Sequence, residues 1–380
     1  MRVPLGTIPV RFCPSKETLA VLNGREWICS FSGGKDSTAL VTWIEWLRRV
    51  GMVKCQSPRL VMSDTGVEFP FLRGIADRVM AALAAAGWAC EVVTPPVSQR
   101  LYCIIFGRGV TPVHPRGRKM RWCTRATKID PMTRYARGLT GDMLQLSGVR
   151  WGESDVRDGK LRTAGCAAGG ECGLPDPGPG VYGPIITWRT CQVIEWLSGK
   201  AGDGIADSLA DMSPAMLELV GVYEVKTEQA GMFPDIPPKL SALRFGCIGC
   251  PAIGTEKVTR SKRQRDNPAW QHLGRIYDIW QALYLRRNRC CRIRAKDGQR
   301  YGKKFKAGYV GYGPLKMEAR QRYFAELMQV QADSGVTLVT PDDVAFIRDC
   351  WARKVYPRGW SEADEAVQPP DEGLFAEAAR

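Results

Sequence analysis

The stretch that decides the fold is Glu26-Trp27-Ile28-Cys29-Ser30-Phe31-Ser32-Gly33-Gly34-Lys35-Asp36-Ser37. Its first seven residues are apolar and β-prone, and residues 36–50 then place apolar side chains at helical spacing. The sequence therefore predicts a strand, a Gly turn and a helix. Backbone N–H groups in such a turn, together with the positive dipole end of the helix, hold an anion. We expect a phosphate group to bind at this junction.

The strand-then-helix pattern recurs along the first two thirds of the chain. The further strands that we expect are residues 59–63, 91–94, 143–149 and 183–187, and the further helices are residues 71–86, 131–138 and 190–197. Strands that alternate with helices imply a parallel sheet with helices on both faces, which is an α/β, Rossmann-like architecture.

A change in composition after Pro251 predicts a domain boundary near Ile253. Residues 1–253 are expected to form the nucleotide-binding domain, with a Cys-rich insert at about 160–182 and 244–251. A smaller, mainly helical and basic region should cover residues 254–360, with helices at 270–285, 315–331 and 341–355. Residues 361–380 read as an acidic, frayed tail.

The composition narrows the class of protein. The formal net charge is +15, which favours a polyanionic partner or a phosphorylated small molecule, although an inert basic surface is the alternative. Fourteen cysteines in a chain of 380 residues, with no apolar leader at the start, do not suit a secreted disulfide scaffold. No stretch is long and apolar enough for a membrane span, so we expect a cytoplasmic protein with reduced thiols and no membrane partner.

The Gly turn itself has two interpretations. It is not a Walker loop, because Lys35 follows the glycines directly. A plain turn in which Asp36 and Ser37 cap a helix is the simpler interpretation. However, Ser32-Gly33-Gly34-Lys35-Asp36-Ser37 resembles the Ser-Gly-Gly-x-Asp-Ser signature of the PP-loop superfamily of ATP pyrophosphatases. The resemblance implies the HUP fold of adenine nucleotide alpha hydrolases, which bind ATP with Mg²⁺ and cleave it at the α-phosphate.

Two further motifs resemble one branch of that superfamily, the phosphoadenosine and adenosine phosphosulfate (PAPS and APS) reductases and the DndC-type sulfur-transfer proteins of DNA phosphorothioation. Ser63-Asp64-Thr65-Gly66 is similar to the second reductase motif, and residues 148–157 are similar to the Gly-x-Arg-x-x-x-Ser-x-x-Arg stretch that serves the phosphate or sulfate end. All three motifs follow strands, whose carboxyl ends collect ligands at a topological switch point. We therefore expect one nucleotide site.

The resemblance also implies which residues line that site. Those expected at the nucleotide are Ser32, Gly33, Gly34, Lys35, Asp36, Ser37, Asp64, Thr65, Gly66, Gly148, Arg150, Ser154 and Arg157. Those expected to be catalytic are Lys35, Asp36, Arg150 and Cys172. Arg150 and Arg157 can pair bidentately with phosphate oxygens.

A second constellation consists of cysteines. Cys247-Ile248-Gly249-Cys250 is a C-x2-C step whose two thiolates can bind one metal centre, either an iron-sulfur cluster or zinc. The family resemblance favours a 4Fe-4S cluster, since Cys123 stands where APS reductases have the first cysteine of a pair, with Thr124 in place of the second. The expected ligands are Cys123, Cys172, Cys247 and Cys250, with Cys166 as the alternative to Cys172. Packing of buried cysteines is the simpler interpretation.

These features lead to three hypotheses. The first is an ATP pyrophosphatase that adenylates an acceptor oxygen so that sulfur can displace AMP, with DNA or RNA as acceptor and a cysteine desulfurase as sulfur donor. The second is a PAPS or APS reductase that releases sulfite; it is disfavoured because the reductase Glu-Cys-Gly-Leu-His motif is absent from the C-terminus, and its mid-chain likeness at residues 171–174 continues with Pro175. The third is a nucleotide-gated nucleic-acid binding protein without turnover. The basic segment 286–306, with Tyr301 and Phe305, favours a polymer partner.

Overall fold

The computed structural model describes residues 10–112, 122–139, 143–152, 158–159, 181–224, 247–250, 267–284, 291–294, 299–300, 303–304 and 312–366. The chain forms two compact units, and each unit is assembled from three separate stretches. Unit 1 consists of Met1–Ser63, Phe69–Val93 and Arg134–Phe245, and unit 2 of Asp64–Glu68, Thr94–Thr133 and Gly246–Arg380. The sequence predicted a single boundary near Ile253. Instead, residues 64–68 and 94–133 belong to unit 2 and interrupt unit 1 twice.

Unit 1 is built on a parallel sheet of five strands. These are β1 (Trp27–Phe31), β2 (Arg59–Ser63), β3 (Ala89–Val93), β4 (Leu144–Ser147) and β5 (Val181–Tyr182). Their order is β3-β2-β1-β4-β5, and every neighbouring pair is parallel. In the central strand, Cys29 lies opposite both Leu60 and Leu146. The α/β, Rossmann-like fold predicted from the sequence is therefore confirmed.

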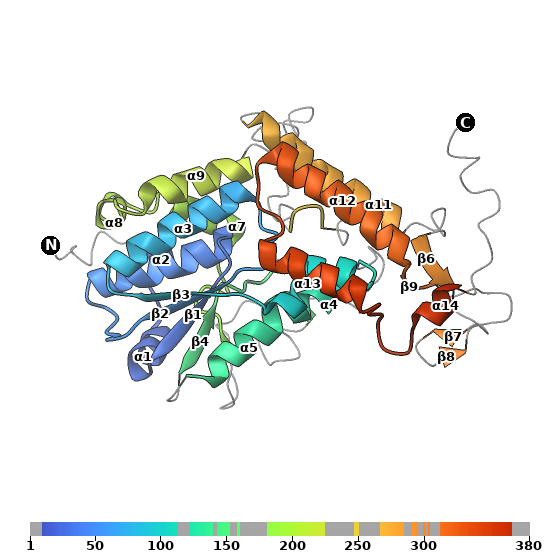
Figure 1. Ribbon diagram of the computed structural model, residues 1–380. Coiled ribbons are helices and arrows are strands. Elements are labelled where there is room, and N and C mark those ends of the chain that lie inside the picture. Colours follow the sequence, from blue (N-terminus) through green and yellow to red (C-terminus); the bar gives the residue numbers. More distant parts are fainter. Residues whose placement is uncertain are drawn as a thin grey trace. The chain divides into compact units, whose positions relative to one another are not determined.

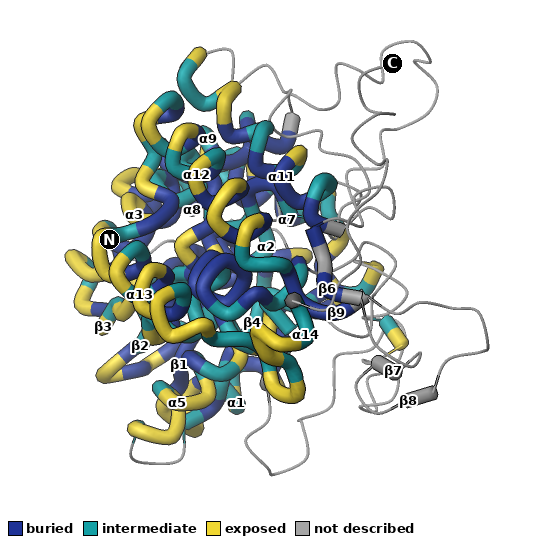
Figure 2. The backbone as a smooth tube through the Cα atoms, turned by 45° about the vertical axis from the view of Figure 1, so that its right-hand side comes forward, coloured by how far each residue is buried: buried dark blue, intermediate teal, exposed yellow. Residues whose placement is uncertain are grey.

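Helices lie on both sides of this sheet (Figure 1). Unit 1 contains η2 (Val10–Phe12), α1 (Lys16–Gly24), α2 (Lys35–Arg49), α3 (Pro70–Ala85), α7 (Thr190–Leu197), α8 (Asp203–Ser208) and α9 (Ser213–Glu224), and α5 (Asp130–Arg137) enters it at Arg134. In the view of Figure 1, α2, α3, α7, α8 and α9 lie above the sheet, and α1 and α5 lie below it. Edge strand β3 is largely exposed, whereas α2 is buried along most of its length (Figure 2).

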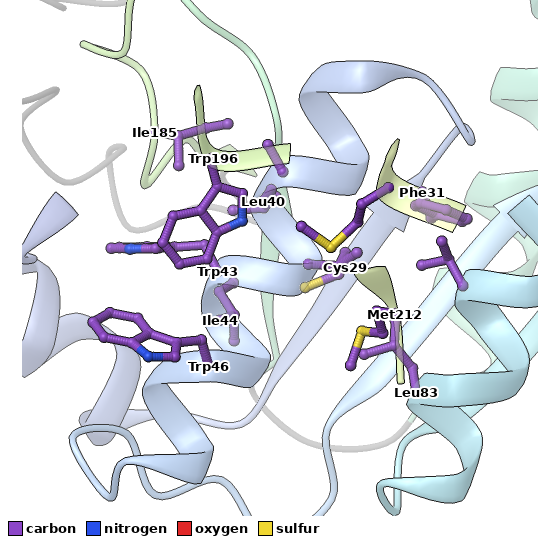
Figure 3. Close-up of a cluster of buried hydrophobic side chains, with 14 of the residues drawn as sticks. Cys29, Phe31, Leu40, Trp43, Ile44, Trp46, Leu83, Ile185, Trp196 and Met212 are labelled. Carbon is purple, nitrogen blue, oxygen red and sulfur yellow. The ribbon is translucent and has the colours of Figure 1, made fainter. Parts of the chain in front are cut away.

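The core of unit 1 surrounds α2. Trp43 and Trp46 of α2, Trp196 of α7 and Cys29 of the central strand belong to one cluster of buried side chains (Figure 3). The Trp46 and Trp196 rings meet edge to face with centroids 5.6 Å apart, and the Trp196 indole N–H donates to Thr42 Oγ1 at 2.9 Å. Buried aromatic side chains contribute large apolar areas to such a core. Packing therefore fixes α2, the helix that follows the Gly turn, along most of its length.

Unit 2 is mainly helical with two short antiparallel ladders, β6 with β9 and β7 with β8. Its elements are η3 (Val97–Gln99), the π-helices η4 (Cys103–Gly107) and η5 (Arg125–Ile129), α4 (Trp122–Thr124), η8 (Pro268–Gly274), α11 (Arg275–Tyr284), β6 (Arg292–Arg294), β7 (Gln299–Arg300), β8 (Lys303–Lys304), β9 (Tyr312–Leu315), α12 (Met317–Ser334), α13 (Pro341–Ala352) and α14 (Glu362–Ala366). The Trp280 ring stacks on both Tyr102 and Phe106. This stack joins the second stretch of unit 2 to the third.

A fully buried arginine makes the same connection. Arg320 of α12 donates to the backbone oxygens of Leu315 at 3.0 Å, Gly107 at 3.3 Å and Val355 at 2.7 Å. Its guanidinium passes so close to Gly109 that a Cβ atom there would lie 2.3 Å from Nη2. The absence of a side chain at Gly109 therefore makes room for this guanidinium, while Gly107 supplies one of its acceptors.

Some elements differ from those predicted. Residues 184–187 form a turn, and the strand ends at Tyr182. The Ile186 N–H donates to the Gly183 carbonyl oxygen at 3.0 Å, a local bond that takes the place of a strand-to-strand bond. The helix expected at 270–285 begins with seven residues of 3₁₀-helix. Within the expected frayed tail, Glu362–Ala366 form a helix, and the Glu365 carboxylate accepts from Met317 N at 2.9 Å and from Tyr356 Oη at 2.7 Å. In the part of the chain that is described, no helix has the length and apolar character of a membrane span.

Candidate functional site

The Gly turn lies between β1 and α2, as the sequence predicted. Gly33 has a φ of +67°, and a Cβ atom on it would lie 2.8 Å from the Cβ of Ala76, so only glycine fits. Gly34 is the N-cap residue of α2, and its oxygen accepts from Ser37 Oγ at 3.0 Å. The Ser32 and Ser37 hydroxyls lie 3.0 Å apart. The two serines thus close the turn internally.

The third motif packs directly on the first turn of α2. A Cβ atom on Gly148 would lie 2.7 Å from the carbonyl oxygen of Asp36 and 3.0 Å from the amide nitrogen of Ser37. These neighbours are backbone atoms, which cannot move aside as a flexible side chain does. The loop after β4 and the helix after β1 are therefore in contact because residue 148 has no side chain. The structure thus brings two of the three predicted motifs together.

Arg150 has a different environment from the one expected for a phosphate ligand. It is buried, and it donates to Asp36 Oδ1 at 2.7 Å, to the Trp188 carbonyl oxygen at 2.8 Å and to Thr190 Oγ1 at 3.4 Å. Nε and both terminal nitrogens of the Arg150 guanidinium thus each donate one hydrogen bond. In this structure Arg150 therefore holds Asp36 in place, and its acceptors at residues 188 and 190 were not predicted.

Asp36 lies between two cations. Its second oxygen, Oδ2, accepts from Lys35 Nζ at 2.8 Å, while Oδ1 accepts from Arg150. The Lys35 and Arg150 side chains are 7% and 3% exposed, so solvent screens these ion pairs weakly. One carboxylate between two cations leaves an excess of one positive charge beside the N-terminus of α2. That excess favours an anionic ligand.

Tyr223, in the last turn of α9, covers the start of α2 and was not predicted. Its hydroxyl accepts from the Lys35 backbone N–H at 3.4 Å, and its ring centroid lies 5.3 Å from Lys35 Nζ. Burial, with a further contribution from Asp36, raises the pKa of Tyr223 to about 12. The hydroxyl is therefore neutral at cellular pH.

The second motif belongs to unit 2 and forms a compact turn. Asp64 Oδ1 accepts from Gly66 N at 2.8 Å, and Gly66 has a φ of +72°. Glu68 accepts from the Thr65 backbone N–H at 3.2 Å and from the Thr65 hydroxyl at 2.5 Å. Thr65 is buried, so this carboxylate satisfies polar groups that water cannot reach. The role of Glu68 had not been expected from the sequence.

The C-x2-C step also lies in unit 2, beside that turn. Ile248 N donates to Val67 O at 2.8 Å, and Cys250 N donates to Cys247 O at 3.1 Å. Gly249 has a φ of +60°, and a Cβ on it would lie 2.8 Å from Ile276 Cγ2. These contacts fold the step into a tight turn against the start of α11.

Burial raises the pKa of two thiols of this constellation, Cys247 and Cys123. It raises the pKa of Cys247 to about 12; Lys128 opposes the rise, and Cys250, Glu68 and Cys123 add to it. The pKa of Cys123 is raised by burial and by Cys250. The three thiols are thus near enough to influence one another. Within the described ranges, however, no three His, Cys, Asp or Glu side chains are arranged to hold a metal ion.

Several predicted site residues lie outside the described residues. These are Ser154, Arg157, Cys166 and Cys172, together with Tyr301, Phe305 and most of the basic segment 286–306. Of the lysines in that segment, the structure describes Lys303 and Lys304, whose backbone forms strand β8. The fourth thiol ligand and the polymer contacts therefore stay predictions.

Comparison with models of known protein families finds no match for this chain, and comparison with curated proteins finds none either.

Proposed function

We propose that the chain binds an adenine nucleotide, ATP in the first place, at the loop of residues 32–37 and cleaves it between the α- and β-phosphates. One observation carries the proposal most directly: the contact between Gly148 and the Asp36 backbone, which joins two motifs at the carboxyl ends of adjacent parallel strands. Ligands of open α/β sheets bind at such strand ends. A plain helix-capping turn does not require a second loop to pack on it.

The charges around the loop suit transfer at phosphorus. The helix dipole and Lys35 would stabilise the charge that develops on the α-phosphate and on the leaving pyrophosphate, which is electrostatic catalysis. Asp36 orients Lys35, and Arg150 orients Asp36. Because both oxygens of Asp36 bond to cations, we expect Mg²⁺ to enter with the phosphates of the nucleotide.

The reaction class follows from the resemblance to sulfur-transfer proteins. An acceptor oxygen would attack the α-phosphorus, pyrophosphate would leave, and the acceptor would carry AMP on that oxygen. A sulfur nucleophile would then displace AMP, which takes the oxygen with it. We propose a nucleic acid, with DNA favoured, as acceptor and a desulfurase-type protein as sulfur donor; the net charge of +15 is compatible with such an acceptor.

The test compares two glycines of unit 1, neither of which has a positive φ. Gly148→Ala places a methyl group 2.7 Å from a backbone oxygen, whereas Gly24→Ala meets nothing within 4 Å. We expect pyrophosphate release from ATP to fall at least about tenfold in Gly148→Ala, since misplacement by 1 Å costs up to about 100-fold. Gly24→Ala should retain wild-type release. Equal activity in both variants, or no pyrophosphate release by the wild type, would contradict the proposal.

The iron-sulfur cluster is a separate part of the proposal. The donors that would hold it are the thiols of Cys123, Cys247 and Cys250, with Cys172 or Cys166 as the fourth, and thiolates are the ligands that such clusters use. A bound cluster would supply redox or sulfur chemistry. Anaerobic purification should give a brown protein with about four irons per chain. Iron should be lost in Cys247→Ser and kept in Cys191→Ser, whose cysteine is exposed; one zinc and no iron would refute the cluster.

A further inference from the structure

The Tyr223 side chain contacts both the backbone N–H and the ammonium group of Lys35. The Tyr223 hydroxyl takes the backbone N–H at the start of α2, and the Tyr223 ring faces the ammonium group at 5.3 Å. The same hydroxyl lies 3.7 Å from the position that a Cβ on Gly34 would occupy, so it lies directly over the Gly turn. All these residues belong to unit 1.

Tyr223 contacts the same two groups of Lys35, the backbone N–H and the ammonium group, that a bound phosphate would need. In a Gly turn that opens a helix, the first backbone N–H groups and a neighbouring lysine are the groups that hold phosphate oxygens. A backbone N–H carries one proton, and it cannot donate fully to a tyrosine oxygen and to a phosphate oxygen at the same time. The two acceptors therefore compete.

We propose that Tyr223 is a gating residue, whose hydroxyl takes the place of a phosphate oxygen on the Lys35 amide and must leave it when a nucleotide binds. This inference rests on the proposed function. Tyr223 lies in the last described turn of α9. A shift of that turn frees the Lys35 amide and moves the ring away from the ammonium group, which keeps its bond to Asp36.

The neutral state of the hydroxyl suits this role. Burial holds the pKa of Tyr223 near 12, so the group does not compete as an anion and forms only a neutral hydrogen bond to the amide. A phosphate oxygen is charged, and charge-assisted hydrogen bonds are about twice as strong. The nucleotide can therefore displace the tyrosine, which nevertheless lowers the apparent affinity.

The experiment is a matched pair of Tyr→Phe variants in the full chain. Tyr223→Phe removes the competing oxygen and keeps the ring over Lys35. Tyr182→Phe removes a hydroxyl that is equally buried in unit 1 but lies 2.9 Å from Thr18 Oγ1. The probe is α,β-methylene-ATP, which resists cleavage at the α-phosphate, and its dissociation constant is measured by calorimetry. Thermal unfolding is recorded for every protein.

We expect Tyr223→Phe to bind the probe about 2- to 10-fold more tightly than the wild type, which corresponds to one neutral hydrogen bond. Tyr182→Phe should bind like the wild type, and a destabilised but otherwise unchanged protein would not bind more tightly. Unchanged or weaker binding in Tyr223→Phe overturns the gating role and identifies the hydroxyl as inert or as a ligand donor.

A third variant separates failure of the gate from failure of the site. Lys35→Ala removes the ammonium group at the centre of the proposed nucleotide site. If the wild type binds the probe more tightly than Lys35→Ala does, the site stands whatever Tyr223→Phe shows. If those two proteins bind equally, the proposed function fails and the gating role fails with it.

Discussion

The carbonyl oxygen of Val67 accepts a 2.8 Å hydrogen bond from the backbone N–H of Ile248. Val67 follows the Asp64–Gly66 turn, and Ile248 stands between Cys247 and Cys250. The bond therefore links the second predicted nucleotide motif to the C-x2-C step inside unit 2.

The close approach of Gly249 to α11 gives the first prediction. Gly249→Ala strains a φ of +60° and also places a methyl group 2.8 Å from Ile276 Cγ2 and 2.9 Å from Tyr277 N. Gly335→Ala is the matched control, since Gly335 has a φ of +65° and open space around it. We expect Gly249→Ala to lower the free energy of unfolding by about 1–3 kcal/mol more than the control does, because overpacking adds to the backbone strain. Denaturant unfolding measures the free energy of unfolding of both variants. Equal losses would show that the neighbours of Gly249 move aside without cost.

The buried guanidinium of Arg320 gives the second prediction. Arg320→Ala leaves the carbonyl oxygens of Leu315, Gly107 and Val355 without this donor and opens a cavity. We expect a loss of about 3 kcal/mol in the free energy of unfolding. Arg322→Ala, two residues further along α12, removes a side chain that is 60% exposed and should change stability by less than about 0.5 kcal/mol. Similar values for the two variants would refute the role of Arg320 in joining the stretches of unit 2.

The thiol of Cys55 gives the third prediction. Burial, together with its hydrogen bond to Glu26 Oε2 at 3.3 Å, raises the pKa of Cys55 from 9.0 to about 11. Between these values the unfolded chain loses the proton and the folded chain keeps it, so the stabilisation is complete below pH 9 and is lost as the pH rises towards 11. Cys55→Ala should therefore show a shallower decline in unfolding free energy between pH 9 and 10.5 than the wild type. Cys191→Ala, at an exposed cysteine, should follow the wild type; if Cys55→Ala follows it too, the Cys55 thiol does not contribute.

Local patterns predicted the parts of unit 1 that depend on neighbouring residues. The strand, Gly turn and helix at residues 27–49, and the helix Thr190–Leu197, were predicted because apolar spacing and glycine positions are local. The strand at residues 183–187 was wrong, since residues 184–187 form a turn closed by the bond from Ile186 N to Gly183 O. Tyr223 could not have been predicted, because it is 188 residues from Lys35 and lies in an apolar helix that reads as core. Arg150 is expected at phosphate from its motif and its place after a strand. Its contacts with Asp36, Trp188 and Thr190 could not be predicted, because these residues come together only in the folded chain.

The interleaving of the two units decides how the protein can be dissected. A fragment that begins at residue 254 would lack Gly107 and Gly109, whose carbonyl oxygens accept from Arg320 Nη1 and Leu315 N. A fragment that ends at residue 253 would carry those carbonyls with no partner. Both cuts divide unit 2, so truncation at this point does not separate the two units. Co-expression of the two pieces, by contrast, should restore the missing contacts through fragment complementation.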